Sequence, residues 1–111
     1  MSLSSKKQPP PIIEISVLCK AWQEDGVWNA VAEDLPVAVF GHTFEQARDN
    51  LHDAILSHLQ SAQEMGTLQP VADELLRRAS ERSFTMAEMP PDHVMMKMRA
   101  AVQDHRVVAL T

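Results

Sequence analysis

The stretch that decides the fold runs from Gly41 to Leu59 and reads GHTFEQARDNLHDAILSHL. Thr43 is typical of a helix N-cap, because its hydroxyl can accept a first-turn backbone N–H, and Gln46 three residues later can complete a capping box. The apolar residues recur at intervals of three and four, which places them on one stripe: Phe44, Ala47, Leu51, Ala54, Ile55 and Leu59. The pattern therefore predicts a helix that ends near Met65-Gly66 and covers one side of another element.

Three strand patterns precede this helix. Residues 12–22 alternate in the period-two manner of a half-buried strand, and the face expected beneath the helix is Ile13, Ile15, Val17, Cys19 and Ala21. Asp25-Gly26 predicts a hairpin turn into a second strand over 27–32. Pro36 separates this strand from a third over 37–40, and Gly41 fits a tight turn into the helix. The sequence thus predicts a three-stranded antiparallel meander with the long helix packed on one face.

The remaining chain predicts a shorter helix over 70–80 and a fourth strand over 94–102, although the methionines and alanines of the latter also suit a helix. The apolar residues of the shorter helix recur at spacing four and are Val71, Leu75 and Ala79. Residues 1–11 are polar, end in prolines and are expected to form a disordered arm, and residues 103–111 a tail or an extra strand. The expected architecture is one α+β domain over 12–102, in the order β-β-β-α-α-β.

Composition narrows the class of protein. A chain of 111 residues is long enough for one domain whose core needs no disulfide. Its single cysteine, Cys19, permits no intrachain disulfide, which favours a reducing, cytoplasmic location. No apolar run approaches the roughly 18 residues of a membrane span, so we expect no membrane contact. The net charge of −5 disfavours non-specific nucleic-acid binding and suits a basic partner.

The first half of the chain carries three motifs in succession: an aromatic-x-Ala strand, an acidic-Leu-Pro break, and Gly-x-Thr-x-x-Gln-Ala opening a helix. The residues that form them, with three later helix positions, are Trp28, Ala30, Asp34, Leu35, Pro36, Gly41, Thr43, Gln46, Ala47, Asn50, Ala54 and Ile55. This arrangement resembles the HicB-type antitoxin domain over residues 12–62, with 94–102 matching the last strand of that family. The chain departs from the family at Val37-Ala38, where Gly-Cys is usual, and no ribbon-helix-helix or helix-turn-helix module is recognised.

The resemblance implies a partial RNase H-like fold and a toxin–antitoxin setting. In that setting the domain binds and neutralises a small basic mRNA-cleaving toxin, and it performs no catalysis itself. The family usually self-associates, which implies a dimer or tetramer. The motif residues to which the resemblance gives a structural role are Leu35, Pro36, Gly41, Thr43, Gln46 and Ala47.

Two features of the sequence suggest a surface for partners. Leu18 and Trp22 fall on the strand face turned away from the long helix, where nothing obvious covers them, and exposed apolar groups mark interfaces. The candidate oligomer or partner surface is Leu18, Trp22, Trp28, Glu33 and Asp34. The stretch 24–53 holds seven acidic residues against one arginine, a net charge of −6, which would steer a basic partner toward it.

A basic cluster on the shorter helix leaves a second function open. Arg77, Arg78 and Arg82 could contact nucleic acid, so the alternative is a DNA- or RNA-binding transcriptional regulator. They could equally be balanced by nearby carboxylates on neighbouring turns, namely Asp73, Glu74 and Glu81. A further alternative is an orphan HicB-like domain with no toxin.

The residue types that catalyse or bind metal form no recognisable constellation. None of the five histidines has the spacing of a zinc pair, and the three glycines form no phosphate loop. Cys19 lies on the strand face expected to be buried, where a thiol is usually inert. We therefore expect no catalytic residue, no metal and no cofactor.

Overall fold

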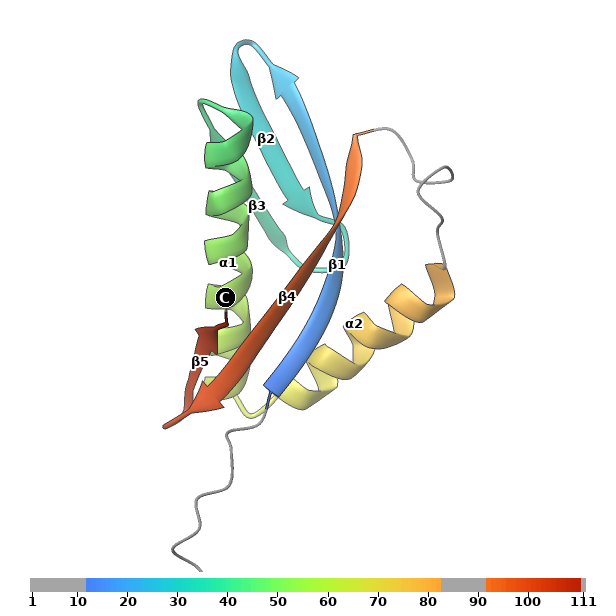
Figure 1. Ribbon diagram of the computed structural model, residues 1–111, viewed down its shortest axis with the longest axis vertical. Coiled ribbons are helices and arrows are strands. Elements are labelled where there is room, and N and C mark those ends of the chain that lie inside the picture. The colour runs from blue at the N-terminus through green and yellow to red at the C-terminus, as the bar shows by residue number, and fades with distance from the viewer. Residues whose placement is uncertain (1–11, 83–91, 111) are drawn as a thin grey trace, which may run out of the picture.

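The computed structural model describes residues 12–82 and 92–110, so the predicted arm over 1–11 lies outside it. The elements are β1 (Ile12–Glu24), β2 (Val27–Ala32), β3 (Val37–Gly41), α1 (Phe44–Glu64), α2 (Leu68–Arg82), β4 (His93–Gln103) and β5 (Arg106–Ala109). The α+β class is confirmed. The predicted order β-β-β-α-α-β is one strand short, because β5 follows β4. All strands join one antiparallel sheet in the order β3-β2-β1-β4-β5, which curls around α1 (Figure 1).

The long strand β1 holds the sheet together. Its C-terminal half, Cys19–Glu24, pairs with β2, and its N-terminal part, Ile12–Lys20, pairs with β4. Beside the N-terminal half of β1, on the edge that β2 does not reach, lies α2 (Figure 1). The second helix therefore extends the layer formed by α1 instead of covering the opposite face of the sheet.

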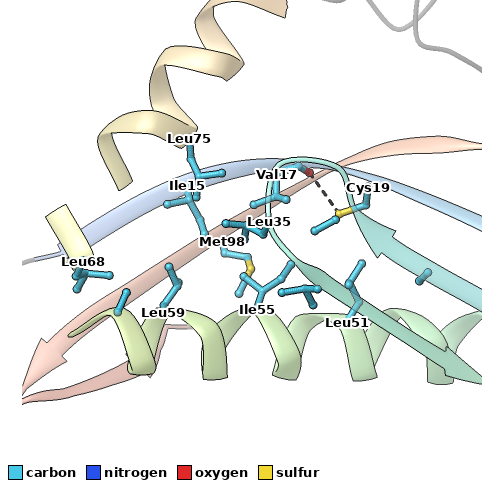
Figure 2. Close-up of a cluster of buried hydrophobic side chains, with 14 of the residues drawn as sticks. Ile15, Val17, Cys19, Leu35, Leu51, Ile55, Leu59, Leu68, Leu75 and Met98 are labelled. Atoms are coloured by element: carbon cyan, nitrogen blue, oxygen red, sulfur yellow. Dashed lines mark hydrogen bonds between the residues drawn. The ribbon is translucent and has the colours of Figure 1, made fainter. Parts of the chain in front are cut away.

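The core confirms the apolar stripe of α1 except at its first residue, because Phe44 is 38 % exposed. Leu51, Ile55 and Leu59 are almost completely buried and point toward β1 (Figure 2). Leu68 and Leu75 bring α2 into the same cluster. The inward side chains of the sheet that complete it are Ile15, Val17, Cys19, Ala30, Ala32, Val37 and Met98. One continuous core thus lies between the inner face of the sheet and the two helices.

Both ends of α1 carry the expected caps. The Thr43 hydroxyl accepts the backbone N–H of Gln46 at 3.0 Å. The Gln46 side chain reaches one residue further back than the predicted capping box, since it accepts the N–H of His42 at 2.6 Å. At the other end Gly66 has a φ of +75°, and the N–H of Thr67 bonds to the carbonyl of Ala62 at 2.8 Å, as in a Schellman motif.

Gly41 is required for space rather than for backbone freedom. A Cβ built at this position would lie 2.6 Å from the backbone nitrogen of Ala47. The strand β3 therefore approaches the first turn of α1 more closely than any side chain allows. The sequence predicts a tight turn at this glycine, and in the structure the close approach of β3 to α1 also requires it.

Two tight turns of the same kind build the hairpins of the sheet. Asp25 and Gly26 both have positive φ, 53° and 77°, as the Asp-Gly signal predicted for a two-residue turn. Asp104 and His105 also have positive φ, 49° and 65°, and join β4 to β5. The stretch 94–102 is thus a strand, and the alternative of an extra strand within 103–111 is the one the structure adopts.

Replacing Leu51 by Asp should unfold the protein or lower its free energy of unfolding by more than about 4 kcal/mol, because an unpaired carboxylate would enter the core. Thermal or urea unfolding measures the loss. Ser57→Asp, on the exposed side of the same helix, is the matched control and should change stability little. Equal stability of the Leu51→Asp variant and the parent would contradict the packing described.

Replacing Gly41 by Ala should cost about 1–3 kcal/mol, since β3 must move away from α1 to admit the methyl group. Urea unfolding of the variant tests this expectation. A variant as stable as the parent would mean that the close contact between Gly41 and Ala47 is not required by the fold.

Candidate functional site

Two pairs of aromatic side chains lie where the β1–β2 hairpin meets the start of α1, Trp22 with Phe40 on one face of the sheet and Trp28 with Phe44 on the face toward the helix. Trp28 and Phe44 pack edge to face with ring centroids 5.4 Å apart. Phe40 is 66 % exposed on the edge strand β3. It lies opposite Asn29 of β2, which in turn lies opposite Trp22 of β1, so Phe40 and Trp22 are on the same face of the sheet. We call this set, Trp22, Trp28, Phe40 and Phe44, the hairpin end; the β1–β2 hairpin and the start of α1, which carry it, lie at the top of the molecule in Figure 1.

Exposed carboxylates lie on the elements that form the hairpin end. Glu24 and Asp25 occupy the turn of the hairpin, and Glu45 and Asp49 lie on the first turns of α1; all four residues are exposed. The nearby basic groups are Lys20, whose ammonium lies 5.4 Å from the Trp22 ring centroid, and Arg48, which is paired with Asp49 at 3.3 Å. This end of the molecule therefore carries exposed aromatic area together with a net negative charge.

The predicted partner surface does not form as one patch. Leu18 is only 6 % exposed, which corrects the expectation that it lies uncovered. It occupies a central strand, with Met95 as its cross-strand neighbour and its carbonyl bonded to the N–H of Glu33 at 2.8 Å. The side chain of Asp34 is 2 % exposed and also drops out of the surface.

The remaining members of that predicted surface separate into two places. Trp22 and Trp28 are half-buried and belong to the hairpin end, on opposite faces of the sheet. Glu33 lies at the far end of β2, where its carboxylate is 3.1 Å from the Nε2 atom of His93. The sequence analysis did not include Phe40 and Phe44 in the partner surface. Phe40 could have been included, because it occupies an outward-facing position of a short strand that follows the Pro36 break.

The arginines of α2 are held in ion pairs. Arg77 bonds to Glu74 and, at 2.7 Å, to Glu81. Arg78 bonds to Glu74 at 2.8 Å and to the buried Asp34 at 3.3 Å. The charge-balance interpretation is confirmed for these two residues, and the side chain of Arg82 lies outside the described part of the chain. Asp34 thereby links the acidic-Leu-Pro turn to α2.

These arginines also change the titration of their shared partner. Hydrogen bonds from Arg77 and then Arg78 lower the pKa of Glu74 from 4.5 to about 2. The same contacts raise the pKa of both guanidinium groups. The cluster is therefore an ionised network at any pH near neutrality.

Cys19 is a packing residue. It is 1 % exposed, and its thiol donates to the carbonyl of Val17 at 3.4 Å (Figure 2). Burial raises the pKa of the thiol to about 11, so almost none of it ionises at neutral pH. A protonated, enclosed thiol is a poor nucleophile and a poor metal ligand.

Within residues 12–82 and 92–110, no three His, Cys, Asp or Glu side chains come close enough to hold a metal ion. Over the same residues, neither helix has the length and apolar character needed to cross a membrane. The expected absence of catalysis, metal and cofactor stays a prediction.

Comparison with known proteins yields no relative: no protein-family model matches the chain, and no curated protein or solved structure is detectably similar to it. The class defined here is an α+β domain with a curled five-stranded antiparallel sheet around one long helix. The likeness to HicB-type antitoxins rests on the sequence motifs alone.

The Glu74 network predicts a pH-dependent contribution to stability. The folded pKa of Glu74 lies below its ordinary value, so its carboxylate stabilises the fold fully above pH 4.5 and loses this effect as the pH falls toward about 2. The difference in urea midpoint between the parent and Glu74→Gln should therefore be largest above pH 4.5 and vanish near pH 2. Asp73→Asn is the control, because Asp73 accepts from Gln69 at 2.8 Å instead of from an arginine. An equal pH dependence of the two variants would contradict the assignment.

Proposed function

We propose that this chain is a non-catalytic protein-interaction domain of the antitoxin type, which binds and neutralises a small basic mRNA-cleaving toxin in the cytoplasm. The observation that carries the proposal is the hairpin end, where exposed carboxylates lie on the same elements as the aromatic side chains of the two sheet faces. The sequence resemblance supplies the class of partner. The surface supplies the chemistry by which such a partner would be held.

The aromatic residues suit the centre of an interface. Phe40 is 66 % exposed and Phe44 38 %, although large apolar side chains usually avoid water. Aromatic anchors are enriched among the few residues that carry most of the binding free energy of protein complexes. Phe40 also lies on an edge strand, so a partner can approach it from the side as well as from the face.

The carboxylates suit the rim. Glu24, Asp25 and Glu45 would attract a basic protein over several ångströms and speed its association, and added salt would screen the attraction. A short mRNA-cleaving protein must itself carry basic groups to hold RNA. An acidic surface that covers those groups would block RNA binding without any chemistry of its own.

The alternative of a nucleic-acid-binding regulator is less well supported. Its strongest feature was the arginine cluster on α2, and Arg77 and Arg78 are engaged by Glu74, Glu81 and Asp34. A phosphate would have to displace these carboxylates. An orphan domain would share the fold without a toxin, and the experiment below separates it from the proposal.

The test uses the product of the reading frame adjacent to this one, which the proposal expects to be short, basic and dependent on one histidine for mRNA cleavage. Titration calorimetry should show a complex with this chain, and RNA cleavage should stop when the chain is added in slight excess. Phe40→Ala and Glu45→Gln should each weaken the complex about tenfold or more, as for anchor and charged contacts.

The matched control is Leu76→Ala, which removes a residue 62 % exposed on α2, away from the hairpin end. It should leave binding unchanged. A neighbouring product that binds equally well to all variants would place the interface elsewhere, and the lack of binding or of inhibition would overturn the proposed function.

A further inference from the structure

We propose that the chain forms a two-fold dimer through the free edge of β5, with Ala109 of each copy opposite Ala109 of the other. The inference is independent of the proposed function, because β5 and the hairpin end lie at opposite ends of the molecule (Figure 1). It replaces the expectation that self-association uses Leu18 and Trp22.

The outer edge of β5 presents backbone groups in alternation. Among the strands within residues 12–82 and 92–110, β5 is the last of the sheet, and β4 pairs with one of its two edges. The N–H of Leu110 bonds inward to the carbonyl of Arg99 at 2.9 Å, whereas the N–H of Val107 bonds outward to Gln60 at 2.6 Å. In an antiparallel ladder the odd-numbered residues of β5 therefore point their N–H and C=O groups away from β4, and Ala109 is the next of them.

Gln60 of α1 already imitates a peptide group of a sixth strand. Its side-chain oxygen accepts the N–H of Val107, and its amide nitrogen donates to the carbonyl of His105 at 3.2 Å. A neighbouring strand would offer the same acceptor and donor at this place. Gln60 thus satisfies the edge near the turn and leaves the part around Ala109 open to another chain.

A groove provides room for that chain. It has a volume of about 550 Å³ and lies between α1 and β5. Its lining residues on α1 are Leu56, Ser57, Gln60 and Glu64, and on the strand Arg106 to Ala109. An extended segment placed there would bond to β5 on one side and contact Leu56 on the other.

The edge is complementary to itself. With Ala109 opposite Ala109, each donates its N–H to the carbonyl of the other across the two-fold axis. The same register places Val108 of one copy beside Leu110 of the other, twice. These are the exposed apolar residues at this edge, 44 % and 38 % exposed, and their cross-strand contact would shield part of each side chain from water. The two hydrogen bonds of Gln60 are made to His105 and Val107, so pairing at Ala109 displaces neither of them.

Other occupants fit less well. Residues 9–11 are prolines, which have no N–H to donate to a strand edge. A charged or bulky segment from another protein would not pair the two apolar residues of β5 with each other. A second copy satisfies the backbone and the side chains at once.

The first test is cross-linking in the full chain. Ala109→Cys should form a disulfide-linked dimer under mild oxidation, because directly opposed residues of a hydrogen-bonded pair lie about 5.5 Å apart at Cα, within the range of a disulfide. The native Cys19 is buried and does not compete. Val94→Cys, 48 % exposed at the far end of β4, is the matched control and should stay monomeric on a non-reducing gel.

The second test measures association directly by sedimentation. The parent should be dimeric at high micromolar concentration and dissociate on dilution. Ala109→Pro removes only the outward N–H, and Val108→Lys places a charge at each Val108–Leu110 contact, so each should raise the dissociation constant about tenfold or more. Val94→Lys, as a matched change elsewhere, and Trp22→Glu, at the hairpin end, should leave it unchanged.

Three results would overturn the proposal: a parent that is monomeric at high micromolar concentration, cross-linking of Val94→Cys as efficient as that of Ala109→Cys, or full association of folded Val108→Lys. Should Ala109→Pro fail to fold by circular dichroism, the lysine variant and the cross-link decide the question. Toxin binding that persists in the monomeric variants would show that the two surfaces act separately.

Discussion

The fold depends on burying one stripe of α1 against the inward side chains of β1. Leu51, Ile55 and Leu59 are removed from water by this contact, and Ile15 and Val17 are the strand residues in the same buried cluster. The sheet curls because strands on both sides of β1 must reach the same helix. β2 and β3 contact α1 from one side and β5 from the other, while α2 packs against the part of β1 that β2 does not reach.

Local patterns predicted most of the elements. The capped stripe of α1, the parity of β1 and the Asp25-Gly26 turn each depend on residues close in sequence, and the structure contains all three. The fifth strand was harder, because Asp104-His105 lacks the glycine that announces a two-residue turn. Its signal was weaker: aspartate tolerates positive φ better than most residues, and a run of branched residues follows it.

The surface was predictable only in part, because the exposure of a side chain depends on residues distant in sequence that the local alternation of apolar and polar residues does not reveal. Parity placed Leu18 on the outer face correctly, yet Leu18 is only 6 % exposed there, with Met95 beside it on the paired strand. The aromatic cluster depends on the register that sets Trp28 opposite Gly41, which brings Phe44 within reach. Arg78 and Asp34 are 44 residues apart in the chain, too far for a helix-turn argument to join them.

The division of β1 between two partners has a consequence for the order in which the chain acquires its structure. One half of the strand meets β2 across a two-residue turn, whereas the other half must wait for β4, which is synthesised after both helices. The loop entropy lost in the second pairing is much larger, and contacts of long sequence separation form slowly. A nascent chain can therefore assemble the meander and α1 early, while the N-terminal half of β1 keeps an unpaired edge until translation has passed Gln103. During that interval α2 can already cover the opposite edge, the one that β2 does not reach, while the edge that awaits β4 stays open.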